Sequence, residues 1–292
     1  MNKPDFIIIG AMKSATSTLH EQLAKQSGIF MSVPKEPNYF SDDSQYALGD
    51  DWYDELFNDA DPADLCGESS THYTKLPDYP DTLQRMSKRL ESPKLIYVMR
   101  HPIDRLISHY IHQWTQNVFK CDINQAIDGY EELTAYSCYV KQLTPYFEQY
   151  GYQNVLPVFT ESLRVNPQKE LERVAKFIGH VEPVVWHDDV LEQNVSSERF
   201  RTFRGRSVVD SRLVIFLRRR LIPKSWRNKV KKALTMTDKP RIDQTHQKML
   251  VALFDKDLAE LGAMMGIHLN CDNYKKVTCE TELNWSKAYW DK

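Results

Sequence analysis

The chain has 292 residues, of which 41% are hydrophobic and 27% charged, a composition typical of a globular protein with a large core. Its formal net charge of -2 lacks the broad basic excess of proteins that coat nucleic acid, so we expect no nucleic-acid partner. Five cysteines without a C-x-x-C pair fit neither a disulfide framework nor a zinc knuckle. No apolar run is long enough for a signal segment or a membrane span, and together these features predict a soluble, cytoplasmic protein.

Short apolar runs alternate with segments of helical period over the first 200 residues or so. We expect strands at residues 5–11, 64–69, 94–100 and 154–159. Helices are expected to begin at Pro102 and at the Asn166-Pro167 pair, the second of them closing on Gly179. This alternation predicts an α/β fold in which helices flank a mostly parallel sheet.

After about residue 200 the strand signals stop, and helices are expected near 208–222 and from about 241 to 266. We therefore expect one domain over residues 1–292, with an α/β nucleotide-binding core over 1–200 and a helical extension over 201–292. Residues 216–234 carry eight Lys or Arg and no acidic residue. This basic segment is either a solvated helix face or, because Trp226, Val230 and Leu234 are interleaved with the cations, a peripheral contact with a membrane or an anionic acceptor.

The first predicted strand runs directly into Lys13 and a row of small hydroxylated residues, in the stretch IIIGAMKSATSTLHEQL. The N–H groups and the positive dipole end of a helix that starts there favour a bound phosphate. This is not the kinase loop G-x-x-x-x-G-K-[ST], because Lys13 follows Gly10 by only three residues and no second glycine precedes it. The alternative is a plain helix start with a capping box from Thr18 to Glu21 and a surface Lys13.

A later strand ends on Arg100 and leads into a helix, in the stretch KLIYVMRHPIDRLISHY. Residues at helical spacing predict a core stripe, with Ser108 beside it: Ile103, Leu106, Ile107, Tyr110, Ile111 and Trp114. A nucleotide kinase would place an acidic residue at the end of such a strand to hold Mg²⁺, whereas an arginine binds a phosphate oxyanion. Two anion sites at neighbouring strand ends predict a nucleotide with two separate phosphates.

Three segments together resemble the sulfotransferases that use 3'-phosphoadenosine 5'-phosphosulfate (PAPS), especially the heparan-sulfate-type and related bacterial enzymes. GAMKSATSTL at residues 10–19 is similar to their 5'-phosphosulfate loop, and MRHPIDRLISHY at residues 99–110 is similar to their 3'-phosphate motif. KEPNYF at residues 35–40 is similar to the segment that carries the general base in glycan sulfotransferases. The resemblance covers most of residues 5–180 and implies a P-loop-like sheet with PAPS across the carboxyl ends of the strands.

The resemblance implies a role for each matched residue. Lys13 would contact the bridging oxygen and the sulfuryl group, and the 5'-phosphate would be held by Ser14, Ala15, Thr16, Ser17 and Thr18. Arg100 and Ser108 would bind the 3'-phosphate. A second contact to it is expected from Arg204, Gly205 and Arg206, unless that loop is only solvated.

The resemblance also implies how the reaction runs. Glu36 would take the proton of the acceptor hydroxyl, with His72 as the next candidate. His72 and Tyr73 would face the acceptor, although Tyr73 fits a core position equally well. Lys13 would stabilise the departing phosphate without a metal, and the product would be adenosine 3',5'-bisphosphate (PAP).

Two departures from the family pattern stand out. Ala15 occupies the place of the usual glycine of the loop, which requires that this position keep a negative φ. Glu68-Ser69 stands where heparan-type enzymes often carry Glu-Lys, so a second catalytic lysine is missing and Lys35 is the candidate to supply the charge.

We therefore expect a sulfotransferase that moves a sulfuryl group from PAPS to a hydroxyl on a carbohydrate or a small metabolite. One rival is a P-loop-type kinase, which the spacing of Lys13 and the presence of Arg100 disfavour. The other is a nucleotide-binding module without catalysis, which Glu36 beside an intact loop disfavours.

Overall fold

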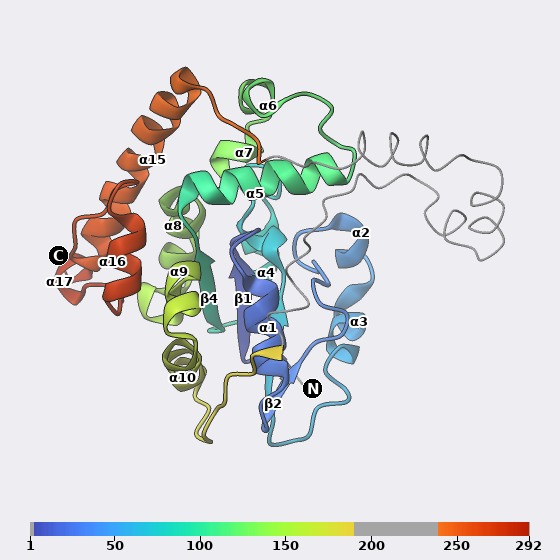
Figure 1. Cartoon of the computed structure of the whole chain (residues 1–292). Coiled ribbons are helices and arrows are strands. Elements are labelled where there is room, and N and C mark those ends of the chain that lie inside the picture. Colours follow the sequence, from blue (N-terminus) through green and yellow to red (C-terminus); the bar gives the residue numbers. More distant parts are fainter. Residues whose placement is uncertain (1–2, 190–238, 292) are drawn as a thin grey trace, which may run out of the picture.

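The computed structural model describes residues 3–189 and 239–291 (Figure 1). Its strands are β1 (Phe6–Gly10), β2 (Ile29–Met31), β3 (Leu65–Ser69), β4 (Lys94–Met99) and β5 (Val155–Phe159). They form one sheet in the order β2-β3-β1-β4-β5, and every neighbouring pair is parallel. The four predicted strands are confirmed. β2 was missed because three residues are too few to show a strand period.

The helices of the described residues are α1 (Thr16–Ala24), α2 (Asp43–Tyr46), α3 (Gly49–Glu55), α4 (Thr82–Arg89), α5 (Pro102–Thr115), α6 (Ile123–Gly129), α7 (Glu132–Ala135), α8 (Tyr139–Tyr150), α9 (Thr160–Val165), α10 (Pro167–Ile178), α15 (Gln244–Met265), α16 (Tyr274–Glu280) and α17 (Lys287–Trp290). Two short 3₁₀ turns are η1 (Thr71–Thr74) and η2 (Tyr152–Asn154).

The predicted helix boundaries agree with the structure where it describes them. α5 begins at Pro102, whose missing N–H is not needed in a first turn. α10 ends before Gly179, which adopts φ 88 and closes the helix in the left-handed conformation that glycine permits. The long helix expected near residues 241–266 is α15.

The helix expected at 208–222 and the basic segment 216–234 lie outside the described residues, so the division of the chain at residue 200 stays a prediction. Among the helices that the structure describes, none is both long enough and apolar enough to cross a membrane.

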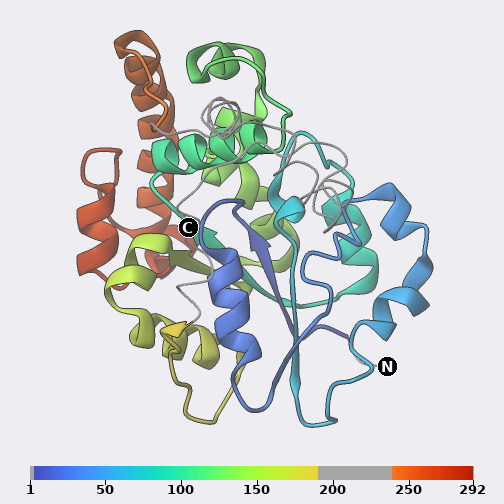
Figure 2. The ribbon, with the colours of Figure 1, turned by 45° about the vertical axis from the view of Figure 1, so that its right-hand side comes forward.

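Different helices cover the two faces of the sheet. Along β1, Phe6 and Ile8 belong to one core cluster and Ile7 and Ile9 to the other, because successive side chains of a strand alternate between its faces. The first cluster includes buried residues of α1 and α10, two helices that lie on the same side of the sheet in Figure 2. The second includes buried residues of α4, α8 and α15. Both faces of the sheet are therefore buried under helices, as is typical of parallel sheets.

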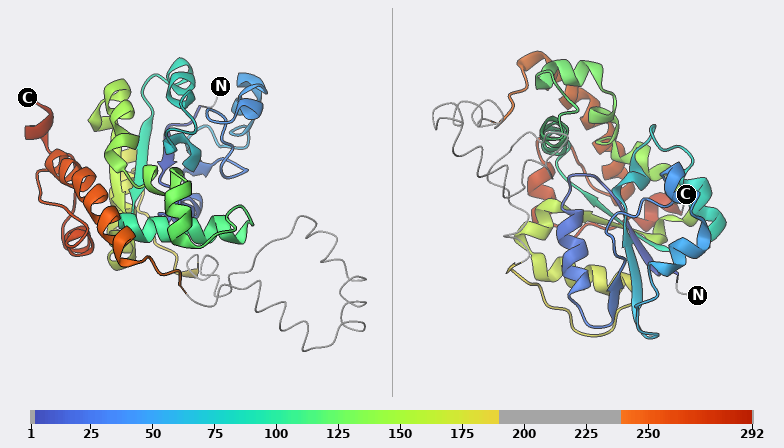
Figure 3. Two further views of the ribbon diagram at one scale, coloured as in Figure 1. Left: turned by 90° about the horizontal axis from the view of Figure 1, so that it is seen from above. Right: turned by 90° about the vertical axis from the view of Figure 1, so that its right-hand side faces the viewer.

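The C-terminal helices stand together at one side of the molecule. Seen from above in Figure 3, α15, α16 and α17 lie on the side opposite α2 and α3. α15 contacts α8, and α16 contacts α9. Of the predicted stripe on α5, Ile103, Leu106, Ile107 and Tyr110 are buried, while Ile111 and Trp114 pack partly buried against the same cluster. Leu250 and Phe254 of α15 belong to that cluster too, so this helix covers part of α5.

Candidate active site

A cleft of about 510 Å³ lies where the strands end at their carboxyl edge. Because all strands are parallel, the segments that follow β1, β3, β4 and β5 come to this one edge. Of the sequence-predicted site residues, those that line the cleft are Lys13, Ala15, Thr16, Ser17, Thr18, Glu36, His72 and Arg100. Lining residues that sequence analysis missed include Thr71, Lys75, His112, Thr160, Arg164 and Trp186.

The loop between β1 and α1 turns through left-handed backbone. Lys13 adopts φ 70 and Ala15 adopts φ 65, so the expectation that Ala15 keeps a negative φ was wrong. The physical reason is the sharp turn from strand to helix, for which Ala15 serves as the N-cap. The first N–H groups of α1, at Thr16 to Thr18, have no carbonyl within the helix to bind and so remain available to an anion. Thr18 lies inside the helix, which excludes the alternative of a helix that starts with a Thr18 capping box.

The strain at Ala15 gives a first prediction. A left-handed conformation costs an L-residue about 1 to 2 kcal/mol, a cost that glycine escapes. We expect Ala15→Gly to raise the free energy of unfolding by about 0.5 to 1 kcal/mol, since the more flexible unfolded chain offsets part of the gain. The matched control is Ala24→Gly, in the last turn of α1, which should lower that free energy. Denaturant unfolding of both variants checks this, and equal destabilisation by both would contradict the observed turn.

Two arginines bring positive charge to the end of β4 and β5. The Arg100 guanidinium donates to the Lys13 carbonyl oxygen at 3.3 Å, and its buried Nε has no partner. Burial lowers the pKa of Arg100, and the like charge of Arg164 on α9 lowers it further. The pKa of Lys13 is lowered by burial and then by Arg100. Three cationic side chains therefore lie near one another, and one of them has a buried N–H without a hydrogen-bond partner. This arrangement fits the binding of a multiply charged anion.

The other predicted phosphate contacts lie further from the cleft or outside the described residues. Ser14 is fully buried, its hydroxyl has no partner, and its carbonyl oxygen lies 3.0 Å from the Thr160 hydroxyl. Ser108 is half-buried on α5 and does not line the cleft, whereas His112, one turn later, does. The loop with Arg204, Gly205 and Arg206 lies outside the described residues.

Glu36 projects from a loop held down on β3. Its backbone N–H donates to the Ser69 carbonyl oxygen at 2.9 Å, and the Asn38 N–H donates to the Ser70 hydroxyl at 3.0 Å. That hydroxyl in turn donates to the fully buried Glu68 at 2.6 Å. Glu36 has φ 58, so the loop is tightly turned at the point where the carboxylate leaves it. This chain of hydrogen bonds fixes the loop relative to the sheet.

The Glu36 carboxylate has a donor at each oxygen. Lys35 Nζ lies 2.8 Å from one oxygen, and the Thr71 hydroxyl lies 3.4 Å from the other. Burial raises the pKa of Glu36, but the charge and hydrogen bond of Lys35, followed by the charge of Lys75, outweigh it and lower the pKa below its ordinary value. Glu36 is therefore ionised at neutral pH, the state that a general base needs.

A search of protein-family models matches residues 3–262 to the sulfotransferase domain, which is most of the chain and includes every element around the cleft. The chain belongs to the sulfotransferase family.

Curated relatives of this sulfotransferase come from animals and a slime mould. The membrane-associated sulfotransferase kil1 of Dictyostelium discoideum is 36% identical over 116 residues, which is 38% of this chain and 24% of that protein. Mouse heparan sulfate glucosamine 3-O-sulfotransferase 3B1 is 30% identical over 185 residues, which is 60% of this chain and 46% of that protein. The aligned regions therefore span less than half the length of these relatives.

Solved structures share the fold. A sulfotransferase from Alicyclobacillus acidocaldarius matches 92% of this chain and 98% of its own, with a TM-score of 0.64 at 21% identity. Mouse sulfotransferase SULT7A1 complexed with PAP matches 88% of this chain and 86% of its own, with a TM-score of 0.51 at 15% identity. The predicted α/β fold, a parallel sheet flanked by helices with a helical C-terminal region, is confirmed.

Of two neighbouring ring side chains in the segment after β3, one is buried in the core and the other lines the cleft. Tyr73 of this sulfotransferase is buried in the core, so the alternative of a core position holds for it. His72 lines the cleft and stacks on Tyr79 with ring centroids 4.7 Å apart. Burial, followed by the charge of Lys75, lowers the pKa of His72 to about 4, so its ring is neutral at physiological pH. Ser69 pairs with His20, whose Nδ1 lies 3.0 Å from the Ser69 hydroxyl.

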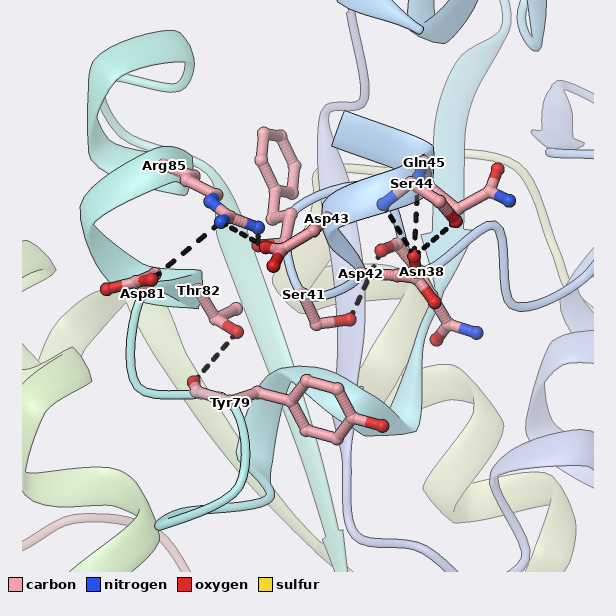
Figure 4. A network of polar contacts seen from close by, with 11 residues as sticks. Asn38, Ser41, Asp42, Asp43, Ser44, Gln45, Tyr79, Asp81, Thr82 and Arg85 are labelled. Atoms are coloured by element: carbon pink, nitrogen blue, oxygen red, sulfur yellow. Dashed lines mark hydrogen bonds and ion pairs between the residues drawn. The ribbon is translucent and has the colours of Figure 1, made fainter. Parts of the chain in front are cut away.

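A second hollow of about 450 Å³ lies beyond Tyr79. Carboxylates from two segments line it, namely Asp42, Asp43, Asp78 and Asp81. Figure 4 shows Arg85 between Asp43 and Asp81, with which it forms ion pairs. Asp42 is bound by the backbone N–H groups of Ser44 and Gln45 at the start of α2. The hollow therefore carries more negative than positive charge, and the stacked pair His72 and Tyr79 separates it from the cleft.

Proposed function

We propose that this sulfotransferase transfers a sulfuryl group from PAPS to a hydroxyl of a carbohydrate or a small metabolite. The observation that carries the proposal is one cleft that is lined by both an ionised Glu36 and the Lys13 loop. A base and a cation that share one cavity are what an in-line displacement needs, since the proton leaves the acceptor as negative charge grows on the leaving phosphate.

PAPS fits the anion-binding features of this cleft. The free N–H groups and dipole of α1, together with Lys13, would hold the 5'-phosphosulfate. Arg100 and Arg164 would hold the 3'-phosphate. Ser108 on α5 stays part of the proposed 3'-phosphate site, although it does not line the cleft. The unpartnered Nε of Arg100, a residue that lines the cleft, is a donor that such an anion satisfies. PAPS supplies the sulfuryl group, and PAP is the product that remains on these residues.

The reaction then exchanges one sulfur–oxygen bond for another. The acceptor oxygen bonds to sulfur, its proton passes to Glu36, and the bond from sulfur to the 5'-phosphate oxygen breaks. Lys13 stabilises the charge that this phosphate oxygen gains. Lys35 keeps Glu36 ionised before the proton arrives, because its ammonium is already bound to the carboxylate at 2.8 Å.

We expect the acceptor to reach Glu36 past the stacked rings of His72 and Tyr79, which lie between the cleft and the second hollow. The carboxylates of that hollow would repel a polyanion, so we expect a neutral or sparsely charged hydroxyl compound to react better than a highly sulfated chain. A peripheral contact of the basic segment 216–234 with a membrane stays part of the proposal.

An acceptor screen with radiolabelled PAPS tests donor and acceptor together. The panel contains heparan sulfate, its unsulfated precursor chain, neutral oligosaccharides and simple phenols. We expect label to move into at least one hydroxyl acceptor, with the neutral compounds ahead. If the protein transfers phosphate from ATP in the presence of Mg²⁺ but transfers no sulfate from PAPS, the alternative of a P-loop-type kinase would be favoured. Tight PAPS binding without turnover on any acceptor would favour a binding module.

The assigned 3'-phosphate site gives a prediction about ligand binding. We expect PAP to bind, and Arg100→Ala, Ser108→Ala and Arg164→Ala each to weaken PAP more than adenosine 5'-phosphosulfate, which lacks the 3'-phosphate. A charge-assisted arginine contact should contribute about 1.5 to 3 kcal/mol, or roughly ten- to a hundred-fold in affinity, and the serine less. Calorimetry with both ligands measures the difference, and equal losses for the two would move these residues away from the 3'-phosphate.

A further inference from the structure

Lys75 directly follows η1 and lines the same cleft as Glu36 and Lys13. It is only 8% exposed. Within residues 3–189 and 239–291 its ammonium forms no ion pair, and the contact that it does make is with the Tyr136 ring, 5.9 Å from Nζ to the ring centre. Burying a lysine ammonium without a carboxylate partner destabilises the folded protein. A buried lysine of this kind in a cleft is therefore a candidate to bind an anionic ligand.

Two other lysines near Glu36, of which only Lys13 lines the cleft, already have roles. Lys35 is bound to Glu36, so it serves the base and is not a free charge for a ligand. Lys13 belongs to the donor loop. On the Glu36 side, Lys75 is therefore the lysine that remains available to a ligand among the residues that line this cleft.

His112 on α5 lines the same cleft as Lys13, Lys75 and Glu36. Burial lowers the pKa of His112 to about 4, with further lowering by the charges of Lys13 and Lys75, while Glu36 acts in the opposite direction. All three charged groups thus lie close enough to act on one imidazole that itself lines the cleft. The space between the donor cation and the base is where the sulfur must pass.

We propose that the Lys75 ammonium binds the non-bridging oxygens of the sulfuryl group during transfer and is a further catalytic residue. The inference rests on the proposed function. In this step the acceptor oxygen bonds to sulfur, the bond to the 5'-phosphate oxygen breaks, Glu36 receives the proton, and Lys75 keeps its own. Lys13 holds the departing phosphate from one side while Lys75 holds the sulfuryl oxygens from the other, so the two charges act on different oxygens of one displacement.

The protonation of Lys75 adds a pH signature. Burial lowers the pKa of Lys75 to about 8, with Arg105 lowering it further and Glu36 and Asp78 raising it. The remaining titratable groups that interact with it are His72, His109 and His112, and the ring of Tyr136. Because the ammonium is the active form, the transfer rate should fall as the pH rises through about 8.

The test compares Lys75→Met and Lys75→Arg with Lys88→Met, an exposed lysine on α4. Single-turnover transfer is measured from PAPS to the best acceptor of the panel, or to water if none reacts. We expect Lys75→Met to slow transfer about 10²-fold. PAP affinity should be unchanged, which shows that the variant is folded. Lys75→Arg should recover most of the rate and lose the decline above pH 8, and Lys88→Met should match the wild type.

Several outcomes would overturn the proposal. A normal transfer rate for Lys75→Met, or a decline above pH 8 that persists in Lys75→Arg, would remove Lys75 from the reaction. A raised acceptor KM with unchanged kcat would make it an acceptor contact instead. If the wild type itself turns over no PAPS, the proposed function fails, and that failure appears in the wild-type reaction before any variant is compared.

Discussion

Glu36→Gln should lower kcat about 10²- to 10⁴-fold, because the amide keeps the size and hydrogen bonds of the side chain but cannot take the acceptor's proton. PAP affinity should hardly change, since a base that faces the acceptor makes no necessary contact with the product nucleotide. The structure supports this separation, as the Glu36 loop is bound to β3 while the proposed phosphate-binding residues Lys13 and Arg100 follow β1 and β4. Single-turnover transfer with an acceptor from the panel measures the effect.

The matched control for Glu36 is Glu55→Gln, an exposed residue of α3, which should leave the rate unchanged. The wild-type rate should also persist at mildly acidic pH. Because the pKa of Glu36 is lowered, its carboxylate stays ionised until the pH falls below the ordinary range for glutamate. A near-normal rate for Glu36→Gln would remove it as the base and leave His72, which also lines the cleft, as the next candidate.

Lys13→Ala should lower both turnover and donor affinity, in contrast to Glu36→Gln. Loss of one charged donor at the leaving oxygen should slow transfer about 10²- to 10³-fold. The lost contact with the phosphosulfate should weaken PAPS about ten- to a hundred-fold. Lys88→Ala on α4 is the control, and it should change neither quantity. Quenched-flow transfer together with PAPS calorimetry separates the two effects, and a loss of affinity alone would leave Lys13 as a binding residue only.

Sequence reasoning predicted the strands and helix ends whose conformation is determined by their own residues or immediate neighbours. The four longer strands are continuous apolar runs, which a sheet buried on both faces requires. Pro102 and Gly179 fix helix ends through their own backbone limits. β2 has no such signal, because its three residues pair with β3 only through the tertiary fold.

The residues of the candidate site likewise fall into those that local sequence patterns predict and those that they do not. Lys13 and Arg100 were predictable as cleft residues because each follows a recognisable strand, and the carboxyl ends of parallel strands meet at one edge. Lys75 and His112 were missed, since each enters the cleft through the path of a turn or a helix that no local pattern reveals. Arg164 was missed as well, although it follows a predicted strand. An arginine shortly after a predicted strand was the one available signal for Arg164.

At Ala15 the sequence led to a wrong prediction of the backbone conformation. Residue type favours a negative φ for alanine, but the turn from β1 into α1 demands φ 65, and the tertiary fold overrides the local preference. Sequence reasoning named Lys35 as the candidate to replace the missing lysine of the Glu68-Ser69 pair, and this stays a prediction. In the structure the Lys35 ammonium is bound to Glu36, and Lys75, six residues beyond Ser69, lines the cleft.

The most direct measurement of the central claim is the stoichiometry of a single turnover. Enzyme in excess is mixed with radiolabelled PAPS and an acceptor from the panel, and the labelled product and PAP are quantified together over time. One PAP should form for each sulfated acceptor, at the same rate, and both should be suppressed in Glu36→Gln while PAP binding persists. No transfer of label from PAPS to any hydroxyl, by a protein that binds PAP, would contradict the account.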